Sequence, residues 1–400
     1  MPKPTRIAIA GCGLTALTVA EELRRNGYSG DLVMTGDETI HPYDRPPLSK
    51  TALATATPPD YLRDPNGYLE LDVDLRLGAR ATNVDVDAHI LHCDGRTIEY
   101  DALVIATGAT PRPLVGAPAG STHMLRTHDD AHRLGESMRQ AGRLIVVGAG
   151  FIGCEVASSA RACDIDVTLL EGLDAPLVRV LGPVVAEELV QLHRRADVDL
   201  RCGVGVVAVE DQGPRGKQVR LADGATLMSP VILAALGVTP NVDWIAGTGI
   251  TVSDGIECDP YGRTSAPDIW AGGDVAAWWD AKLGRHRRFE HWTHAKEQAR
   301  VLAHNLLVTD AAELQIHDTV PYFWSDQHGV KIQALGWPSA DDDVSTLRVG
   351  PDQRLVALYT RQGILTGAVG FGAPQKLLPL RDLIARGASL EQADAQVVAA

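Results

Sequence analysis

Apolar and polar residues follow two kinds of pattern in the first part of the chain. An apolar run from Arg6 leads to two glycines, Gly11 and Gly13, and apolar residues then recur at helical spacing as far as Arg25. A second apolar run follows and ends just before two acids at positions 37 and 38. This order predicts a strand, a helix and a second strand, which together form a βαβ unit of a parallel sheet.

The small residues of this first unit have separate tasks in a dinucleotide-binding turn. Gly11 permits the tight turn after the strand, and Gly13 lets backbone N–H groups approach a pyrophosphate. Ala16 takes the third position, where a small residue lets helix and strand pack closely. Asp37 and Glu38 lie where a carboxylate accepts hydrogen bonds from a ribose.

The same pattern returns in the middle of the chain. Gly148, Gly150 and Gly153 complete a G-x-G-x-x-G motif, and Glu171 closes the strand that follows the helix. Two copies of strand, glycine turn, helix, strand and acid predict two nucleotide sites. A carboxylate at position 171 would repel the 2′-phosphate of NADPH, and no arginine follows before Arg179, so NADH is the expected cofactor.

Composition and charge narrow the class of protein. Four hundred residues exceed what one hydrophobic core usually serves, so two or three domains are expected. A hydrophobic content of 45%, without an apolar run of about 18 to 20 residues, predicts a soluble, cytoplasmic protein. The net charge of −14 argues against a nucleic-acid binder. Six cysteines without a CxxC or other short paired spacing indicate neither a zinc site nor a redox disulfide, and no metal is expected.

Further motifs occur in order along nearly the whole chain. They are PYDRPPLSK (42–50), YDALVIATGATPR (100–112), MLRTHDDA (124–131), AALGVTPN (234–241), IWAGGDVA (269–276), EHWTHAKEQA (290–299) and YFWSDQHGVKIQ (322–333). Together with the two glycine motifs, they resemble the FAD-dependent, NADH-linked ferredoxin reductases of the putidaredoxin reductase and dioxygenase-component type. The resemblance is specific because all of the motifs occur together in this order.

The resemblance implies an α/β fold of the glutathione-reductase type. Two Rossmann-type dinucleotide-binding domains and an α+β C-terminal domain are expected. The FAD-binding domain would be discontinuous, in residues 1–112 and 237–315, with the NADH-binding domain in 113–236 and the C-terminal domain in 316–400.

The resemblance also implies site residues, with FAD on the first glycine motif and NADH on the second. Lys50, Glu155 and Trp292 are expected at the reacting edge of the flavin, as catalytic residues. The chain departs from many relatives at Thr15 and Ala16, where they carry a small residue and a glycine. The full set of expected cofactor contacts is Gly11, Gly13, Thr15, Ala16, Asp37, Glu38, Arg45, Lys50, Val84, Thr107, Gly108, Arg126, Asp274, Trp292, Gly148, Gly150, Ile152, Gly153, Glu171 and Gly237.

The loop HPYDRPPLSK joins three prolines to one lysine. Pro42, Pro46 and Pro47 fix φ and remove backbone donors, which stiffens the approach to Lys50. By the resemblance, Lys50 pairs with Glu155 and assists hydride transfer from NADH to FAD. The loop contains no cysteine, which argues against the disulfide reductases, NADH oxidases and peroxidases of the same fold, since these need a redox cysteine near the flavin.

The electron acceptor is expected to be a separate molecule. The last cysteine is Cys258, so the C-terminal segment has no set of ligands for an iron–sulfur cluster. The resemblance favours a [2Fe-2S] ferredoxin that serves a cytochrome P450 or a ring-hydroxylating oxygenase, with Arg285, Arg287 and Arg288 as a possible docking patch. A rubredoxin as acceptor, an NADH-sensing role like that of apoptosis-inducing factor, and a solvated loop without docking function stay open as alternatives.

Overall fold

A computed structural model describes residues 3–55, 57–213, 216–281 and 283–399. The chain divides into two compact units. Unit 1 consists of Met1–Asp44, Asp60–Thr110 and Thr239–Thr319, and unit 2 consists of Arg45–Pro59, Pro111–Val238 and Val320–Ala400. Two of the places where the chain passes from one unit to the other lie within β8 (Ala109–Pro111) and β16 (Val238–Pro240). The division into three domains stays a prediction.

Unit 1 is built on a five-stranded parallel sheet in the order β19-β7-β1-β2-β3. Its register aligns Ala10 of β1 with Thr35 of β2 and with Ile105 of β7, so the loops after these strands begin at one edge of the sheet. The strands are β1 (Arg6–Ala10), β2 (Asp31–Thr35), β3 (Asp74–Arg76), β7 (Ala102–Ile105) and β19 (Ile269–Ala271).

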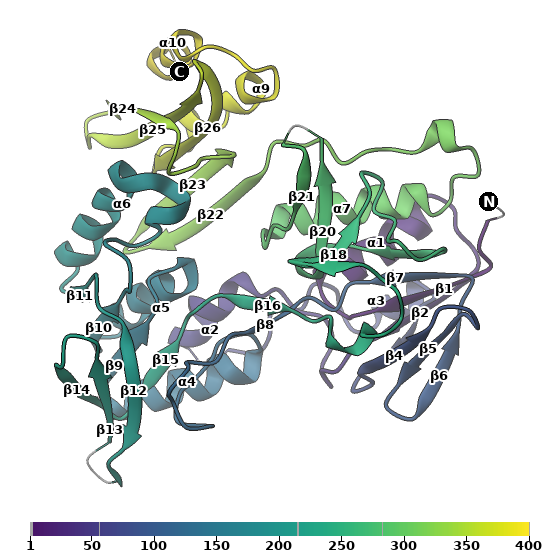
Figure 1. Cartoon of the computed structure of the whole chain (residues 1–400), viewed down its shortest axis with the longest axis horizontal. Helices are drawn as coiled ribbons and strands as arrows, with labels where there is room; N and C mark the ends of the chain where they lie inside the picture. Colours follow the sequence, from purple (N-terminus) through teal and green to yellow (C-terminus); the bar gives the residue numbers. More distant parts are fainter. Residues whose placement is uncertain (1–2, 56, 214–215, 282, 400) are drawn as a thin grey trace. The chain divides into compact units, whose positions relative to one another are not determined.

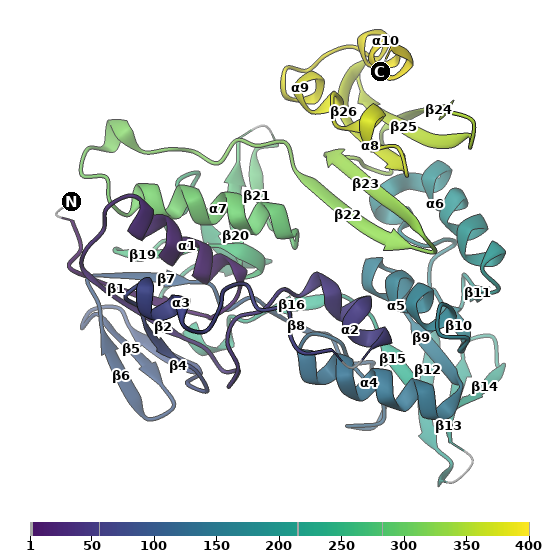
Figure 2. The ribbon, with the colours of Figure 1, turned by 180° about the vertical axis from the view of Figure 1, so that it is seen from behind.

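Helices α1 (Leu14–Arg25) and α7 (Trp292–Asn305) pack against each other in unit 1, and they lie side by side in both views (Figure 1, Figure 2). The predicted helix ending at Arg25 is therefore confirmed as α1. The remaining elements of unit 1 form two further sheets and short helices: β4 (Ala81–Asp85), β5 (Ile90–Cys93), β6 (Arg96–Glu99); β17 (Val252–Ser253), β18 (Gly255–Cys258), β20 (Ala276–Asp280), β21 (Arg285–Arg287); α3 (Gly67–Glu70), η3 (Asp243–Ile245), η4 (Gly273–Val275) and η5 (Ala311–Glu313).

Unit 2 repeats the arrangement around a four-stranded parallel sheet in the order β11-β10-β9-β15. Val147 at the end of β9 aligns with Leu170 of β10, so the second glycine turn and Glu171 begin at one sheet edge. The elements of this part are β9 (Arg143–Val147), β10 (Asp166–Leu170), β11 (Asp199–Arg201), β15 (Ile232–Ala234), an antiparallel sheet of β12 (Val206–Asp211), β13 (Lys217–Leu221) and β14 (Thr226–Ser229), and the helices η1 (Pro46–Ser49), α2 (Thr51–Ala54), α4 (His128–Ala141), α5 (Phe151–Arg161) and α6 (Val178–Arg195).

The C-terminal part of unit 2 is an antiparallel sheet in the order β22-β23-β26-β25-β24. Alternate residues of a strand point to opposite faces, and both faces are apolar here. Leu358 packs with the C-terminal helices, whereas Ala357 and Tyr359 pack against Leu181 of α6. The elements are β22 (Tyr322–Gln327), β23 (Val330–Gly336), β24 (Asp343–Val349), β25 (Arg354–Arg361), β26 (Ile364–Phe371), α8 (Pro374–Leu377), α9 (Leu380–Ala385) and α10 (Leu390–Ala399).

Hydrophobic burial follows the predicted strand and helix pattern. Ile7, Ile9 and Val104 are fully buried in the core of unit 1, and Leu144 and Leu169 are fully buried in unit 2. Such all-apolar strands are typical of a parallel sheet covered on both faces. Among the described residues, no helix is both long and apolar enough to cross a membrane.

Candidate functional site

The first glycine turn, in unit 1, forms an open cradle at the end of β1. Gly11 has a φ of +124°, and a Cβ there would overlap the carbonyl oxygen of Ala106, so only glycine fits. Gly13 begins α1 without a side-chain cap, and a Cβ at Gly13 would meet nothing within 4 Å. Ala16 is fully buried where the helix packs on the sheet. The N–H groups in the first turn of α1, which has no side-chain cap, can bind a pyrophosphate.

Asp37 and Glu38 lie beside this turn. Burial, and after it the charges of Asp37 and Glu38, raises the pKa of the Cys12 thiol to about 12. A raised pKa favours the protonated thiol at neutral pH, which is the less nucleophilic form. Glu38 accepts a hydrogen bond from the Tyr43 hydroxyl at 2.5 Å, which holds its carboxylate in place.

The loop that carries Asp274 packs against the first turn of α1. Gly273 has a φ of +75°, and a Cβ there would overlap the Thr15 hydroxyl, which explains why glycine precedes Asp274. The Gly273 N–H donates to Gln298 Oε1 of α7 at 2.8 Å. Thr15 therefore lies against Gly273, the residue directly before Asp274, although the two motifs are far apart in the sequence.

Thr107 and Gly108 follow β7 at the same sheet edge. The Thr107 hydroxyl donates to the Asn241 carbonyl at 3.1 Å, and the Asn241 side chain donates to the Thr107 carbonyl at 2.8 Å. Gly108 has a φ of +69°, and its carbonyl accepts from the Asn241 N–H at 3.0 Å. Val84, one of the expected cofactor contacts, has a buried side chain on β4, and its N–H donates to the neighbouring Asn83 side chain at 2.9 Å.

Trp292 is the first residue of α7. Its indole Nε1 donates to Asp44 Oδ1 at 2.7 Å, which fixes the orientation of the ring. The Lys296 ammonium lies 4.7 Å from the centre of the ring, within range of a cation–π interaction. The Trp292 ring, which is predicted to pack against a flavin, is therefore oriented by the Asp44 carboxylate at its edge and contacted by the Lys296 ammonium.

The second glycine turn, in unit 2, has the same construction as the first. Gly148 has a φ of +102°, and a Cβ there would overlap the Ala235 carbonyl oxygen. A Cβ at Gly150 would meet nothing within 4 Å, whereas one at Gly153 would overlap the Gly148 carbonyl oxygen. Ile152 is 45% exposed at the start of α5. This turn also offers an uncapped helix N-terminus to a pyrophosphate.

Glu171 follows β10, and its side chain is hydrogen-bonded to this turn. Its carboxylate accepts from the N–H groups of Ala149 and Leu173, each at 2.9 Å. The guanidinium of Arg201, on the neighbouring strand, is bound by Asp199 at 2.9 Å. The predicted Gly237 has a φ of +81°, and its carbonyl accepts from the Arg112 N–H at 3.0 Å.

Lys50 and Glu155 form an ion pair within unit 2, with Lys50 Nζ 2.8 Å from Glu155 Oε2. The hydroxyl of Ser49 donates to the same oxygen, and Ser325 donates to Oε1 at 2.8 Å. The Asp326 N–H donates to Oε1 at 3.3 Å. Because both oxygens of the buried Glu155 carboxylate are hydrogen-bonded, its orientation is fixed. The ion pair then fixes the position of the Lys50 ammonium.

Arg45 and Arg126 also meet in unit 2. Arg45 Nη1 donates to the Arg126 carbonyl at 2.5 Å. The Arg126 N–H donates to Asp130 Oδ2 at 3.1 Å, just before Thr127 and Asp130 cap α4 with reciprocal hydrogen bonds. The backbone of Arg126 thereby has a defined position next to a helix start.

The three arginines of the expected docking patch differ in exposure. Arg285 is exposed, but Arg287 lies over the Phe289 ring, with its Cζ 4.4 Å from the ring centre. The Arg288 side chain is only 6% exposed, and it forms ion pairs with Asp254 at 3.2 Å and Glu290 at 2.7 Å. Arg288 therefore has a structural role, and the patch does not present three free cations.

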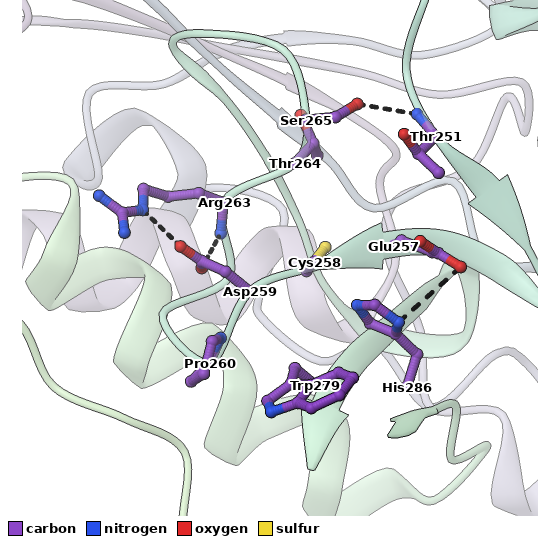
Figure 3. A pocket seen from close by; sticks show the side chains of 10 residues that line it. All are labelled: Thr251, Glu257, Cys258, Asp259, Pro260, Arg263, Thr264, Ser265, Trp279 and His286. Carbon is purple, nitrogen blue, oxygen red and sulfur yellow. Dashed lines mark hydrogen bonds and ion pairs between the residues drawn. The ribbon is translucent and has the colours of Figure 1, made fainter. Parts of the chain in front are cut away.

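A separate open pocket lies in unit 1 (Figure 3), and none of the predicted cofactor contacts lines it. Glu257 and His286 face each other across 3.8 Å, and the Trp279 ring lies edge-on to His286. Arg263 is bound by Asp259 at 2.7 Å. Arg263 is therefore paired inside the pocket, whereas the contact between Glu257 and His286 is an ion pair only when the imidazole is protonated.

Comparisons with known proteins identify the family. Residues 5–299 match the pyridine nucleotide-disulphide oxidoreductase family model, and residues 322–398 match the reductase C-terminal domain. The chain belongs to this oxidoreductase family. The recognition made from the motifs is thereby confirmed.

Individual relatives agree with the family. The chain is 38% identical over 336 residues to the ferredoxin–NAD(+) reductase component of the p-cumate 2,3-dioxygenase system of Pseudomonas putida, covering 83% of this chain and 81% of that protein. Its fold matches a ferredoxin reductase for the CYP199A2 system from Rhodopseudomonas palustris, with a TM-score of 0.92, 31% identity and 97% of each chain covered. It also matches putidaredoxin reductase in a covalent complex with putidaredoxin, with a TM-score of 0.90, 30% identity, and 99% of this chain and 98% of that chain covered. The predicted fold class is confirmed.

Several residues that shape the site were not predicted from the sequence. Ser49 and Ser325 donate hydrogen bonds to Glu155. Asp44 orients Trp292, and Asn241 donates a hydrogen bond to the loop after β7. All four residues lie inside motifs that the sequence analysis quotes, although it assigned no role to them. Their bonding partners are distant in sequence, and no local pattern indicates such partners.

Proposed function

We propose that the chain is an FAD-dependent ferredoxin reductase that oxidises NADH in preference to NADPH. It delivers single electrons to a separate [2Fe-2S] ferredoxin, which serves a cytochrome P450 or a ring-hydroxylating oxygenase. The observation that carries this proposal is the repeated glycine turn. Gly11 and Gly148 both have a positive φ and no room for a Cβ, whereas Gly13 and Gly150 both have an extended backbone and nothing within 4 Å of a Cβ. Relatives named as ferredoxin–NAD(+) reductases support the choice of acceptor.

The residues present fit both cofactors. In unit 1 the turn at Gly13, with Asp37, Thr15 and Asp274 around it, would hold the FAD nucleotide. In unit 2 the turn at Gly150 would hold the pyrophosphate of NADH. Bound FAD supplies the conversion of a two-electron hydride into two single-electron transfers.

The preference for NADH rests on the charge at the second turn. Glu171 is held against this turn by two backbone hydrogen bonds, and its carboxylate can accept from a ribose hydroxyl. Arg201, the nearby cation on β11, is already bound by Asp199, so it is poorly placed to neutralise a 2′-phosphate. The combination disfavours NADPH.

Lys50, Glu155 and Trp292 are proposed to act at the reacting flavin edge. Glu155 positions the Lys50 ammonium, whose charge would stabilise negative charge that develops during hydride transfer. Trp292, oriented by Asp44, would present its flat apolar face to the ring system. These side chains would bind and orient the reacting rings, and the cofactors would supply the redox chemistry.

A cytoplasmic location belongs to the same proposal. All six cysteines are free thiols, and burial raises the pKa of Cys154, Cys258 and Cys12. Free thiols in a chain of this size are typical of a reducing compartment. Among the residues that the structure describes, no disulfide is formed.

The decisive experiment is steady-state reduction of purified acceptors by the FAD-loaded protein. We expect NADH-dependent reduction of cytochrome c to require an added [2Fe-2S] ferredoxin, with NADPH at least about tenfold less efficient. A rubredoxin in place of the ferredoxin is the matched control for acceptor type. Equal rates without any carrier protein, or with rubredoxin alone, would contradict the assignment of the acceptor.

A further inference from the structure

Two histidines and a glutamate converge in unit 1, outside the residues assigned to the cofactors. His294 and Glu297 lie three positions apart on α7 and therefore share one face of the helix. His317 comes from the segment after η5. One potential ligand atom from each of the three residues lies within 4.8 Å of the other two.

His294 is the most buried member of this cluster, with 4% of its surface exposed. Its Nδ1 is buried and has no hydrogen-bond partner in the part of the chain that the structure describes. The His294 ring lies edge-on to the ring of His317, with 4.5 Å between the ring centres and an interplanar angle of 81°. Since buried polar atoms are nearly always bonded, this nitrogen indicates a missing partner.

Glu297 and His317 already face each other, with Oε2 of Glu297 3.6 Å from Nε2 of His317. The Thr319 hydroxyl donates to the same Glu297 oxygen at 2.6 Å and lies 3.2 Å from His317 Nε2. Carboxylates that bind a metal are commonly hydrogen-bonded by such an outer group. Thr319 is therefore suited to orient Glu297.

We propose that His294, Glu297 and His317 form a Zn²⁺-binding site, with water completing the coordination. Bonds of about 2.0 to 2.2 Å in a tetrahedral site place neighbouring ligand atoms about 3.4 Å apart. The 3.6 Å between Glu297 and His317 matches this spacing, and small side-chain rotations bring the widest pair into range. Two imidazoles and one carboxylate favour Zn²⁺ over Mg²⁺ or Ca²⁺, which prefer all-oxygen sites.

The site would add a link between α7 and the segment after η5, beside the hydrogen bonds that join Asn305 to Gln315. His294 and Glu297 belong to α7, which begins with Trp292, and His317 lies near the end of the unit. A metal ion held from both sides stabilises the folded segment in which it binds. We assign the site a structural role, because two of its ligands are on the helix that positions Trp292.

The test uses the FAD-loaded protein after dialysis against a chelator. Calorimetric titration with Zn²⁺ is expected to show one ion bound per chain, and Zn²⁺ is expected to raise the thermal midpoint. Glu297→Gln keeps the size and the Thr319 hydrogen bond, and we expect it to weaken Zn²⁺ binding at least about tenfold. His317→Asn is expected to do the same. His132→Asn, at an exposed histidine of α4, is the matched control and is expected to bind as the wild type does.

Two results would overturn the proposal. One is the absence of Zn²⁺ uptake by the wild type, and the other is equal uptake by the wild type and Glu297→Gln. Either would mean that the three side chains hold one another by hydrogen bonds and ring packing alone. Flavin absorbance and circular dichroism establish that each variant is folded, and the visible absorption of bound Co²⁺, beyond the flavin bands, reports whether imidazole and carboxylate are the ligands.

Discussion

Lys50 and Glu155 are joined by a 2.8 Å ion pair inside unit 2, although they are 105 positions apart in the sequence. The two side chains differ in burial, since Lys50 is 21% exposed and Glu155 is 5% exposed. Glu155 also receives hydrogen bonds from Ser49 and Ser325. The buried Glu155 carboxylate is therefore fixed by its hydrogen bonds and fixes the position of the more exposed Lys50 ammonium.

Replacement of Lys50 by methionine is expected to slow flavin reduction by NADH at least tenfold. The reason is loss of a cation, worth on the order of 4 kcal/mol at about 4 Å from a full negative charge at an effective dielectric near 20. Stopped-flow absorbance measures the rate. Lys376→Met, at another lysine of unit 2, is the control, and a wild-type rate for Lys50→Met would remove the lysine from the mechanism.

A double variant separates the catalytic effect from the structural one. Lys50→Met leaves the Glu155 charge without its cation, which we expect to destabilise the fold by roughly 1 to 3 kcal/mol, less than for a completely buried pair because Lys50 is partly exposed. Adding Glu155→Gln should restore part of the stability but none of the rate. Recovery of both would mean that the pair acts only through folding.

The two open glycines test which turn binds which cofactor. Gly13 and Gly150 both have φ values that alanine adopts, and a Cβ at either would meet no protein atom within 4 Å. We expect Gly13→Ala to lower FAD affinity about tenfold and Gly150→Ala to lower NADH affinity by a similar factor, since the methyl group occupies space that a pyrophosphate needs. Flavin content and NADH titration give the two affinities. The reverse pattern would exchange the two assignments.

Glu171→Ala is expected to weaken NADH binding about tenfold and to narrow the gap to NADPH. The lost carboxylate is a charged acceptor for a ribose hydroxyl, and such bonds contribute about 1.5 to 3 kcal/mol. The measurement is kcat/KM with each nucleotide. Glu210→Ala removes an exposed acid of the same unit as the control. An unchanged ratio of NADH to NADPH efficiency would place the selectivity elsewhere.

The sequence predicted the fold well because its strongest signals are local. Glycine turns, apolar strands and terminal acids need only neighbours in the chain, and Gly11 and Gly148 have the positive φ that the motifs imply. The arginine patch was less predictable because the ion pair of Arg288 depends on Asp254, which a local pattern cannot indicate. For the same reason, the sequence did not predict the cluster of His294 and His317. The search for metal sites relied on cysteine spacing, and these two rings come together only in the folded chain.

Charge reversal at Arg285 tests the part of the docking patch that is exposed. If an acidic ferredoxin docks there, Arg285→Glu should slow ferredoxin reduction several-fold at low salt and less at high salt, because salt screens exposed charges. Arg96→Glu, at an exposed arginine of β6, supplies the control for net charge. An effect that is independent of salt would contradict electrostatic docking at this residue.

His193 is expected to make the stability of unit 2 dependent on pH. It is fully buried, with Nε2 3.1 Å from Gln327 Oε1 and Nδ1 3.0 Å from His328 Nε2. Burial, and after it the neighbouring His328, lowers the pKa of His193 to about 4. The unfolded chain, with a histidine pKa of about 6.5, therefore binds a proton before the folded chain does, and stability falls as the pH drops through this window.

The expected size of this effect is about 2 kcal/mol of unfolding free energy between about pH 7 and about pH 4.5. His193→Gln should remove about 2 kcal/mol of the loss in urea-unfolding free energy between about pH 7 and about pH 4.5, and so make the acid-side slope shallower, whatever its stability at neutral pH. Other histidines leave a residual slope in the variant. They include His291, whose pKa is also lowered to about 4, chiefly by desolvation of its ring. His132→Gln, at an exposed site, should retain the wild-type slope. An identical slope for His193→Gln would show that the folded protein protonates His193 as readily as the unfolded chain does.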